Sequence, residues 1–372
     1  MIVRPLLVLL LLCPLMADAV EVSGRNTNLL LHTENLLNQK QTSDLNRFRL
    51  TAEDKLDQFS WEISYDHTLL YGGLVRDAQY QATSMLPDPT YLDLNSYIHR
   101  GESLDWKHSL YRGWIQYETD QLLFTLGRQR VAWGSGRIWN PTDRFNPIVP
   151  TAVERDQKTG VDAFSASWRY DDFGSFQMIL APGRSRHSVA RKVAGRWQDT
   201  FGEFDAAIMG GIFGDEHLFG IDLSGNIGDG GGRLELVRST SGLNGAYTQL
   251  TAGYDYTITH AWVPEGLYLA IEYFYNGASS FSPVLTMQER LQSLSRSLWG
   301  GMLGYDLTEL IRFDFLLLAD LTRRSLFYAP SVTWSVTDSV DLAVVVQLTD
   351  DGRSGEFSSQ KPLYAVQLDW YF

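Results

Sequence analysis

The chain has 372 residues and a formal net charge of −13 at neutral pH, which argues against nucleic acid as a partner. Aromatic residues make up 13% of the chain, a proportion that suits a membrane β-barrel with aromatic girdles better than a soluble enzyme. The only cysteine is Cys13. A chain processed beyond that position would have no thiol for a disulfide, a cysteine-ligated zinc ion or a cysteine nucleophile.

The first predicted element is a secretory signal peptide over residues 1–19. Arg4 precedes an apolar stretch over 5–16, and Ala-Asp-Ala follows at 17–19, which is the order of charged, apolar and small-residue regions in a cleavable signal. The apolar stretch falls short of the roughly 20 residues that a membrane-spanning helix needs. We therefore expect cleavage after residue 19 and one domain over 20–372.

From about residue 108 onward, apolar and polar side chains alternate in segments of roughly ten residues. In 310–321 the odd positions are apolar, whereas Arg312 and Asp314 share the opposite face. A basic side chain facing lipid near the midplane costs roughly 2 to 4 kcal/mol, so these charges are expected to face water. The segment 266–276 repeats the pattern and places Glu272 on the polar face. This period of two predicts an all-β, antiparallel transmembrane barrel.

Eighteen segments fit this pattern, and sixteen strands would also suit the chain. An even number is expected because both termini of such barrels lie in the periplasm. The segment 188–197 is weakly apolar and is included because omitting it would place the long 277–297 connection on the periplasmic side. The predicted strands are 25–33, 45–53, 59–69, 108–118, 121–131, 161–170, 174–182, 188–197, 203–212, 217–226, 232–240, 246–258, 266–276, 298–307, 310–321, 325–336, 340–350 and 362–372.

The last segment carries an apolar face that ends on an aromatic residue. A soluble β-sandwich also alternates apolar and polar residues, but it has little reason to finish on Trp-Tyr-Phe. A closed barrel instead pairs its last strand with its first, which removes both edges. The ending resembles the signal read by the barrel assembly machinery, and its residues are Tyr364, Val366, Leu368, Trp370 and Phe372.

One segment has the density of a motif. Gly-Arg-Gln at 127–129 is followed by Trp-Gly at 133–134, by Asn-Pro at 140–141 and by Asp143. This arrangement resembles a feature of porin-like Gram-negative outer-membrane barrels, an uncharacterised group distantly related to the alginate-export type. The resemblance covers this segment, and the rest of the chain only as a barrel pattern with an aromatic end. It implies a porin-like protein without identifying a solute.

A regular strand would aim both Arg128 and Arg130 at lipid, and we expect a bulge at Gly127 to return them to the lumen. The glycines, prolines and Asx residues that follow predict an ordered loop over 133–150 that folds into the barrel and narrows it. The candidate constriction residues are Arg128, Arg130, Trp133, Arg137, Trp139, Asp143 and Arg144. The candidate lumen-wall residues are Arg112, Glu272, Arg312 and Asp314.

Two interpretations of these arginines stay open. In the first, they attract anionic solutes, while the two tryptophans offer apolar or sugar-stacking surfaces. In the second, they pair with Asp143, Glu154 and Asp156 and only pin the loop.

Catalytic signatures are weak. The seven histidines show no metal-ligand or triad-like spacing, and Gly-Ser-Gly at 134–136 lacks the nucleophile-elbow pattern. We therefore expect no enzyme activity, no cofactor and no metal.

The predicted function is passive or weakly selective passage of small hydrophilic solutes across the outer membrane of a Gram-negative cell. The expected partners are outer-membrane lipid, lipopolysaccharide and the barrel assembly machinery, and barrels of 16 to 18 strands are wide enough for an aqueous channel. The alternative is a non-conducting scaffold, adhesin or export-system partner, with a barrel enzyme less favoured. Porins of this size are often trimers, so a homo-oligomer stays open, although nothing in the sequence marks a subunit face.

Overall fold

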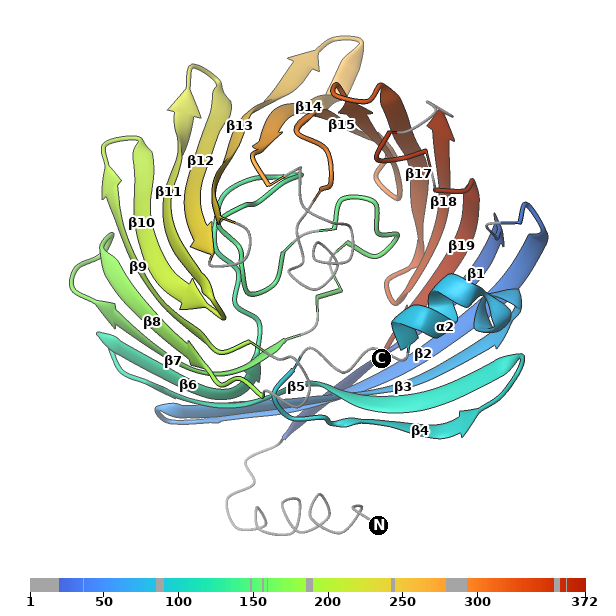
Figure 1. The fold of residues 1–372 in the computed structure, drawn as a ribbon, viewed down its shortest axis with the longest axis horizontal. Coiled ribbons are helices and arrows are strands. Elements are labelled where there is room, and N and C mark those ends of the chain that lie inside the picture. The colour runs from blue at the N-terminus through green and yellow to red at the C-terminus, as the bar shows by residue number, and fades with distance from the viewer. Residues whose placement is uncertain are drawn as a thin grey trace.

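The computed structural model describes residues 20–372 except 36, 85–89, 148, 156, 159, 185–189, 242–244, 279–292, 351–354 and 359. The predicted signal peptide lies outside these residues. The described chain forms one large antiparallel sheet that curls into a ring (Figure 1). No helix within the described ranges has the length and apolar character needed to cross a membrane.

The strands follow one another along the chain with few interruptions. They are β1 (Glu21–Glu34), β2 (Lys40–Leu56), β3 (Phe59–Gly72), β4 (Asn95–Arg100), β5 (Leu104–Glu118), β6 (Leu122–Gln129), β7 (Val161–Arg169), β8 (Ser175–Ala181), β9 (Lys192–Phe201), β10 (Phe204–Phe213), β11 (Glu216–Ile227), β12 (Gly230–Ser241), β13 (Gly245–His260), β14 (Val263–Asn276), β15 (Ser297–Thr308), β16 (Ile311–Asp320), β17 (Ser325–Thr337), β18 (Val340–Asp350) and β19 (Leu363–Tyr371). Two short helices, η1 (Gly73–Arg76) and α2 (Ala78–Ser84), lie between β3 and β4.

The ring closes because β1 pairs with β19 on one edge and with β2 on the other. Strand β4 is not part of the ring, since β3 pairs directly with β5 and β4 only extends the sheet beside β5. Nineteen strands less β4 leave a closed barrel of eighteen, as predicted. The weakly apolar segment 188–197 also forms a strand, displaced to Lys192–Phe201.

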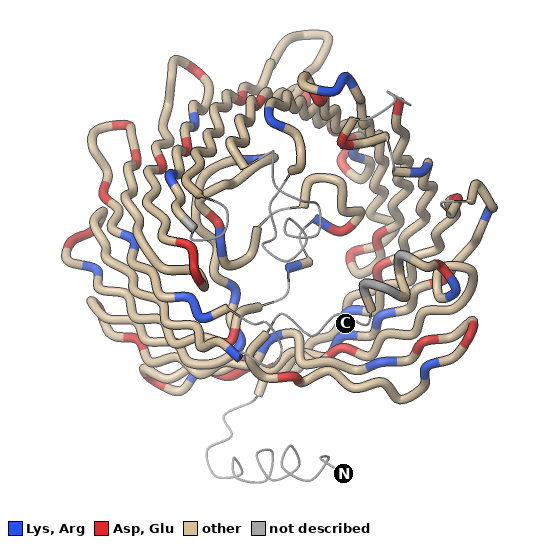
Figure 2. The backbone as a smooth tube through the Cα atoms, in the orientation of Figure 1, with Lys and Arg blue, Asp and Glu red and all other residues tan. Residues whose placement is uncertain are grey.

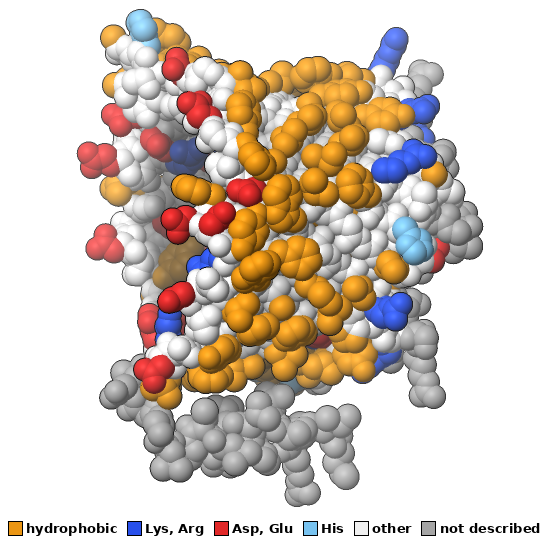
Figure 3. Space-filling model, turned by 90° about the vertical axis from the view of Figure 1, so that its left-hand side faces the viewer, with side chains coloured by type: hydrophobic (Ala, Val, Ile, Leu, Met, Phe, Trp, Pro, Cys, Tyr) orange, Lys and Arg blue, Asp and Glu red, His pale blue; other side chains and the backbone are white. Residues whose placement is uncertain are grey.

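The outer wall is apolar because every second side chain of the ring points away from the lumen. On β16, Leu317 is exposed, whereas its neighbours Leu316 and Leu318 are buried against the interior. Figure 3 shows the resulting band on one side of the barrel, with acidic residues gathered toward one edge and several Lys and Arg side chains along the other. This is the pattern of a wall that contacts acyl chains between two polar interfaces.

The interior is partly filled by residues 131–147, which we name the constriction segment. Trp133 and Phe145 pack with buried residues of β7–β12, while Ile138 and Trp139 pack with buried residues of β14–β17. The segment therefore folds into the barrel as predicted, and it replaces an expected polar inner surface with two apolar contacts on separate parts of the wall, one on either side of β13. Figure 1 shows it as the green trace inside the ring.

The bulge expected at Gly127 is not present. Gly127 has a φ of 127°, yet β6 keeps a continuous register with both β5 and β7 through this residue. The irregularity lies instead in β5, where Ser64 pairs with Arg112 and Tyr65 with Leu110, so that Tyr111 is the extra residue. Bulged strands present two consecutive side chains on one face.

Candidate pore and constriction

Glu272 on β14 holds the middle of the constriction segment. Its carboxylate accepts hydrogen bonds from the backbone N–H groups of Arg137 at 2.8 Å, Ile138 at 3.2 Å and Trp139 at 2.6 Å. The side chain is almost completely buried. Three consecutive N–H groups that converge on one carboxylate form an anion-binding concavity of the backbone. Glu272 therefore faces inward and fastens this part of the segment to the wall.

Glu235 on β12 holds the same segment from another strand. One carboxylate oxygen accepts from the N–H groups of Ser135 at 2.9 Å and Gly136 at 2.6 Å. The other accepts from Thr142, through its N–H at 3.1 Å and its hydroxyl at 2.7 Å. Gly134 has a φ of 87°, and a Cβ there would lie 2.7 Å from this carboxylate. The glycines of this motif thus permit the backbone to approach the buried acid.

The two tryptophans fill space rather than line an open passage. The Trp133 ring meets Phe145 edge-on at 5.2 Å, and its indole N–H donates to Gln177 at 2.7 Å. Trp139 stacks on Phe274 with ring centroids 5.6 Å apart and an interplanar angle of 11°. Both tryptophans are at most 3% exposed. In this arrangement they anchor the constriction segment.

The end of the constriction segment is held by charge pairs. Arg144 contacts Glu216 at 3.2 Å and donates to the Gln249 side chain at 3.0 Å. Asp143 accepts from the N–H of Asn146 at 2.7 Å and lies 3.6 Å from the Lys158 ammonium. Burial raises the pKa of the Asp143 carboxyl above its ordinary value, although these contacts oppose that shift.

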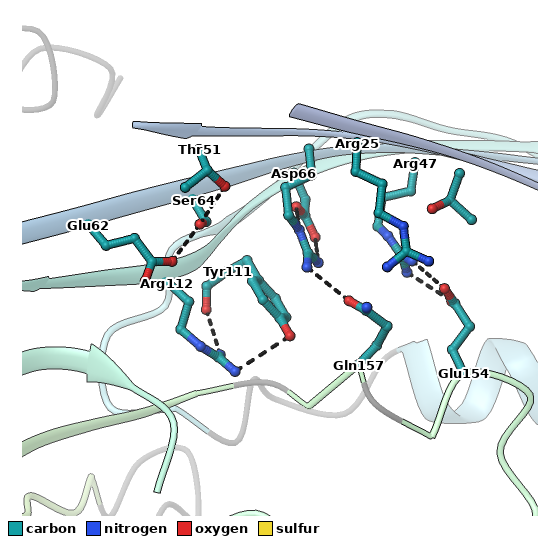
Figure 4. Close-up of polar contacts among 12 residues, drawn as sticks. Arg25, Arg47, Thr51, Glu62, Ser64, Asp66, Tyr111, Arg112, Glu154 and Gln157 are labelled. Atoms are coloured by element: carbon teal, nitrogen blue, oxygen red, sulfur yellow. Dashed lines mark hydrogen bonds and ion pairs between the residues drawn. The ribbon is translucent and has the colours of Figure 1, made fainter. Parts of the chain in front are cut away.

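A row of arginines lines the inner face of the wall formed by β1, β2 and β5. Figure 4 shows Arg47 bonded to Glu154. Arg49 bonds to Asp66 at 2.6 Å and donates to the Gln157 side chain at 2.8 Å. The guanidinium of Arg49 lies over the ring of the bulged Tyr111 at 3.3 Å.

Two further arginines complete this row. Arg25 pairs with Asp369 at 2.8 Å, and Arg112 donates to the backbone carbonyl of Lys158 at 2.6 Å. Arg25 therefore braces the wall itself, whereas the other three arginines hold Glu154, Gln157 and Lys158 of the inward segment against it. Figure 2 shows that charged residues occur on the strands of the ring and also on the segments that cross its interior.

Neither a family model nor a curated protein matches the chain. Solved structures do match over nearly its whole length. Pseudomonas aeruginosa OccK9 (OpdG) aligns with a TM-score of 0.61 at 10% identity, covering 95% of this chain and 98% of that one. Pseudomonas aeruginosa OccK8 (OprE) gives 0.59 at 11% identity, with coverage of 95% and 98%. A BenF-like porin from Pseudomonas fluorescens Pf-5 gives 0.57 at 10%, with coverage of 95% and 99%.

The chain has the fold of these porins. The described residues contain no group of three or more His, Cys, Asp or Glu placed to hold a metal ion.

Within the porin fold, the predicted arginines have different surroundings. Arg128 is 2% exposed and bonds to Asp162 at 2.8 Å and to the Leu110 carbonyl at 2.8 Å. Leu110 lies between the parts of β5 that pair with β4 and with β6, so Arg128 closes the gap between those two strands. By contrast, Arg130 and Arg137 are exposed. These two are the arginines of the motif whose side chains are largely open to solvent.

The remaining wall candidates lie near one end of the barrel. Arg312 pairs with Asp306 at 3.0 Å and with Asp314 at 3.1 Å, beside the turn between β15 and β16, and all three side chains are well exposed. Of the acids considered as partners for the arginines, Glu154 binds Arg47, and Asp156 lies outside the described residues.

Sequence reasoning missed Glu235 and the arginines of β2. Glu235 sits between Leu234 and Leu236, so its alternation marked it as inward-facing but gave no indication of its partners. Arg47 and Arg49 follow the same alternation, since they lie on either side of the exposed Phe48.

Proposed function

We propose that the protein is an outer-membrane channel through which small hydrophilic solutes diffuse, passively or with weak selectivity. The closed eighteen-stranded ring, with an apolar outer wall and charged residues on its inner wall, is the observation that carries this proposal. The ring is wide enough for an aqueous passage. Cleavage of residues 1–19 and insertion by the barrel assembly machinery would place it among outer-membrane lipid and lipopolysaccharide.

Selectivity would come from charge and from the remaining width beside the constriction segment. Arg130 and Arg137 supply exposed positive charge, and the Arg137 guanidinium is 4.0 Å from Asp255 on β13. Opposed charges across a narrowing tune ion preference. No covalent step is required, so the proposal assigns no enzyme activity.

Planar-bilayer recording tests the proposal. The folded barrel, identified by its heat-modifiable mobility, should give steady current steps, and the reversal potential in asymmetric salt gives its ion preference. The buried aromatic contacts of the constriction segment favour one second candidate, a plugged barrel that serves as a scaffold or export-system partner. Folded protein that carries no current at any voltage would establish that second candidate instead.

A further inference from the structure

The inner wall of β17 carries small hydroxyl side chains that face the lumen. Val332 and Trp334 are exposed on the outer wall, so the alternation of the strand turns Ser331, Thr333 and Ser335 inward. All three are half-buried, and within the described part of the chain their hydroxyls have no hydrogen-bond partner. Each hydroxyl can therefore donate to, and accept from, a molecule in the lumen.

The polar face of β17 continues around the wall. Ser335 pairs in register with Asp341 on β18, and Asp341 pairs with Asp369 on β19. Asp369 pairs with Thr27 on β1, which pairs with Arg47 on β2. Side chains directly opposite one another on neighbouring strands share a face of the sheet, so these residues form one row. We name this row, together with Thr333 and Arg25 beside it, the inner polar band.

The Asp369 carboxylate compensates one cation of the inner polar band. It contacts the Arg25 guanidinium at 2.8 Å. It also accepts hydrogen bonds from the Thr27 hydroxyl at 2.6 Å and from the Gln367 amide at 2.7 Å. Both carboxylate oxygens are thus occupied, and Arg25 has its counter-charge within the wall.

The second cation of the band is compensated from the inward segment. Arg47 bonds to Glu154, as Figure 4 shows. Asp341 has no Lys or Arg partner among the residues that the structure describes. Arg25 and Arg47 are therefore outnumbered by the carboxylates of Asp369, Glu154 and Asp341, which leaves one negative charge in excess. An organic anion gains no net attraction from this part of the wall.

Hydration adds to this discrimination. A charged group that leaves water for a narrow passage loses far more solvation free energy than a hydroxyl does, unless a free counter-charge replaces the water. The exposed Arg130 and Arg137 lie outside the band, and Arg137 is 4.0 Å from Asp255. Within the band the guanidinium groups are already paired, whereas the hydroxyls of β17 are free to bond. The band is therefore suited to solutes that carry hydroxyl groups and no charge.

We propose that the channel favours uncharged polyhydroxylated solutes, such as sugar alcohols and sugars, over organic anions of the same size. This inference rests on the proposed channel function and names its solute class. The hydroxyls of Thr333 and Ser335 exchange hydrogen bonds with the solute, and the Asp341 carboxylate repels anions. Arg25 and Arg47 stabilise the wall through their carboxylate partners and do not attract the solute.

The first test compares three solutes that share one carbon chain and differ only in the group at one end: sorbitol, gluconate and glucamine. Vesicles that contain the folded barrel are loaded with all three, with excess salt on both sides to remove any membrane potential. Sorbitol should leave several-fold faster than gluconate. Gluconate that leaves as fast as sorbitol overturns the proposal. Retention of all three by a correctly folded barrel refutes the channel function itself, and the solute class with it.

The second test removes the uncompensated carboxylate. In Asp341→Asn, the efflux of gluconate relative to sorbitol should rise several-fold, because the band then has no negative charge in excess. The matched control is Asp172→Asn, which removes an exposed carboxylate without a cation partner from the β7–β8 turn, outside the band. This control should leave the ratio unchanged. An equal rise in both variants would mean that the overall charge of the barrel sets the ratio, and the role of the band would be wrong.

The third test removes the free hydroxyls and keeps the width of the passage. In Thr333→Val combined with Ser335→Ala, sorbitol efflux should fall several-fold, whereas gluconate efflux and salt conductance should stay the same. Heat-modifiable mobility confirms that the variant is folded. The matched control is Thr240→Val, at an exposed outward position of β12, which should alter neither efflux rate. A proportionate loss for every solute in the double variant would contradict the assigned contact between solute and hydroxyls.

Discussion

Removal of the Glu272 carboxylate should release the middle of the constriction segment. In Glu272→Ala, the N–H groups of Arg137, Ile138 and Trp139 lose their only acceptor seen here. Leaving a buried N–H donor without its carboxylate acceptor costs about 1 to 3 kcal/mol of free energy. Water can enter the vacated site, so the lower end applies, and three bonds give about 3 kcal/mol. The open population of the segment should rise by about two orders of magnitude, since 1.4 kcal/mol corresponds to tenfold.

Hydrogen exchange of the amides of residues 137–139 measures this opening directly, and single-channel conductance measures its effect on the pore. Glu272→Gln keeps one carbonyl acceptor and should show a smaller change. Glu62→Ala is the matched control, because Glu62 is an acid of β3 that accepts from the Trp114 indole at 3.0 Å and has no bond to the constriction segment. If Glu272→Ala leaves amide protection unchanged, or if Glu62→Ala reduces it equally, the proposed fastening is wrong.

Three further predictions concern charge, packing and pH. Replacing Arg130 and Arg137 together by alanine should shift the reversal potential toward cation preference because both are exposed and Arg137 belongs to the constriction segment. Arg312→Ala should not, because Arg312 lies beside the β15–β16 turn and is paired with Asp306 and Asp314; equal shifts would refute the assignment. Trp139→Ala removes the stack on the wall and should weaken docking of the segment by about 3 to 5 kcal/mol, seen as faster limited proteolysis of an otherwise heat-modifiable barrel. Burial raises the pKa of the Glu356 carboxyl, so its contact with residues 293–295 should be strongest below the ordinary carboxyl pKa and should weaken as the pH rises through the raised value. Hydrogen exchange of residues 293–295 measures this pH dependence, and Glu356→Gln should abolish it. A pH profile retained in that variant would contradict the reasoning.

The ring was predictable because a lipid-facing wall forces a strict period of two. On β16 the alternation alone gave the strand, its outward face and the inward side of Arg312 and Asp314. Strand β4 escaped prediction because all six of its residues are exposed, so no apolar face distinguishes it from a loop. The two short helices η1 and α2, between β3 and β4, were not predicted either, because they are too short to show a helical period.

The interior was predictable only in outline. Glycines, prolines and Asx residues indicated an ordered loop, and the loop does enter the barrel. Its fastening depends on pairs far apart in sequence, since Glu235 and Ser135 are 100 residues apart, and alternation reports the side of a wall but not the partner. The bulge expected at Gly127 was wrong for a related reason. It was expected because Arg128 would otherwise face lipid, but Arg128 is buried between β4 and β6, where it bonds to Asp162 and to the Leu110 carbonyl.

Closure of the ring through β1 and β19 separates two scales of stability in one molecule. A closed sheet has no terminal strand that can fray, so separating any seam breaks a whole ladder of backbone bonds at once. The constriction segment is fastened mainly by side chains at a few points and can detach while every ladder stays intact. The barrel wall thus stays intact when the constriction segment detaches, and substitutions in that segment can alter permeability without destabilising the fold.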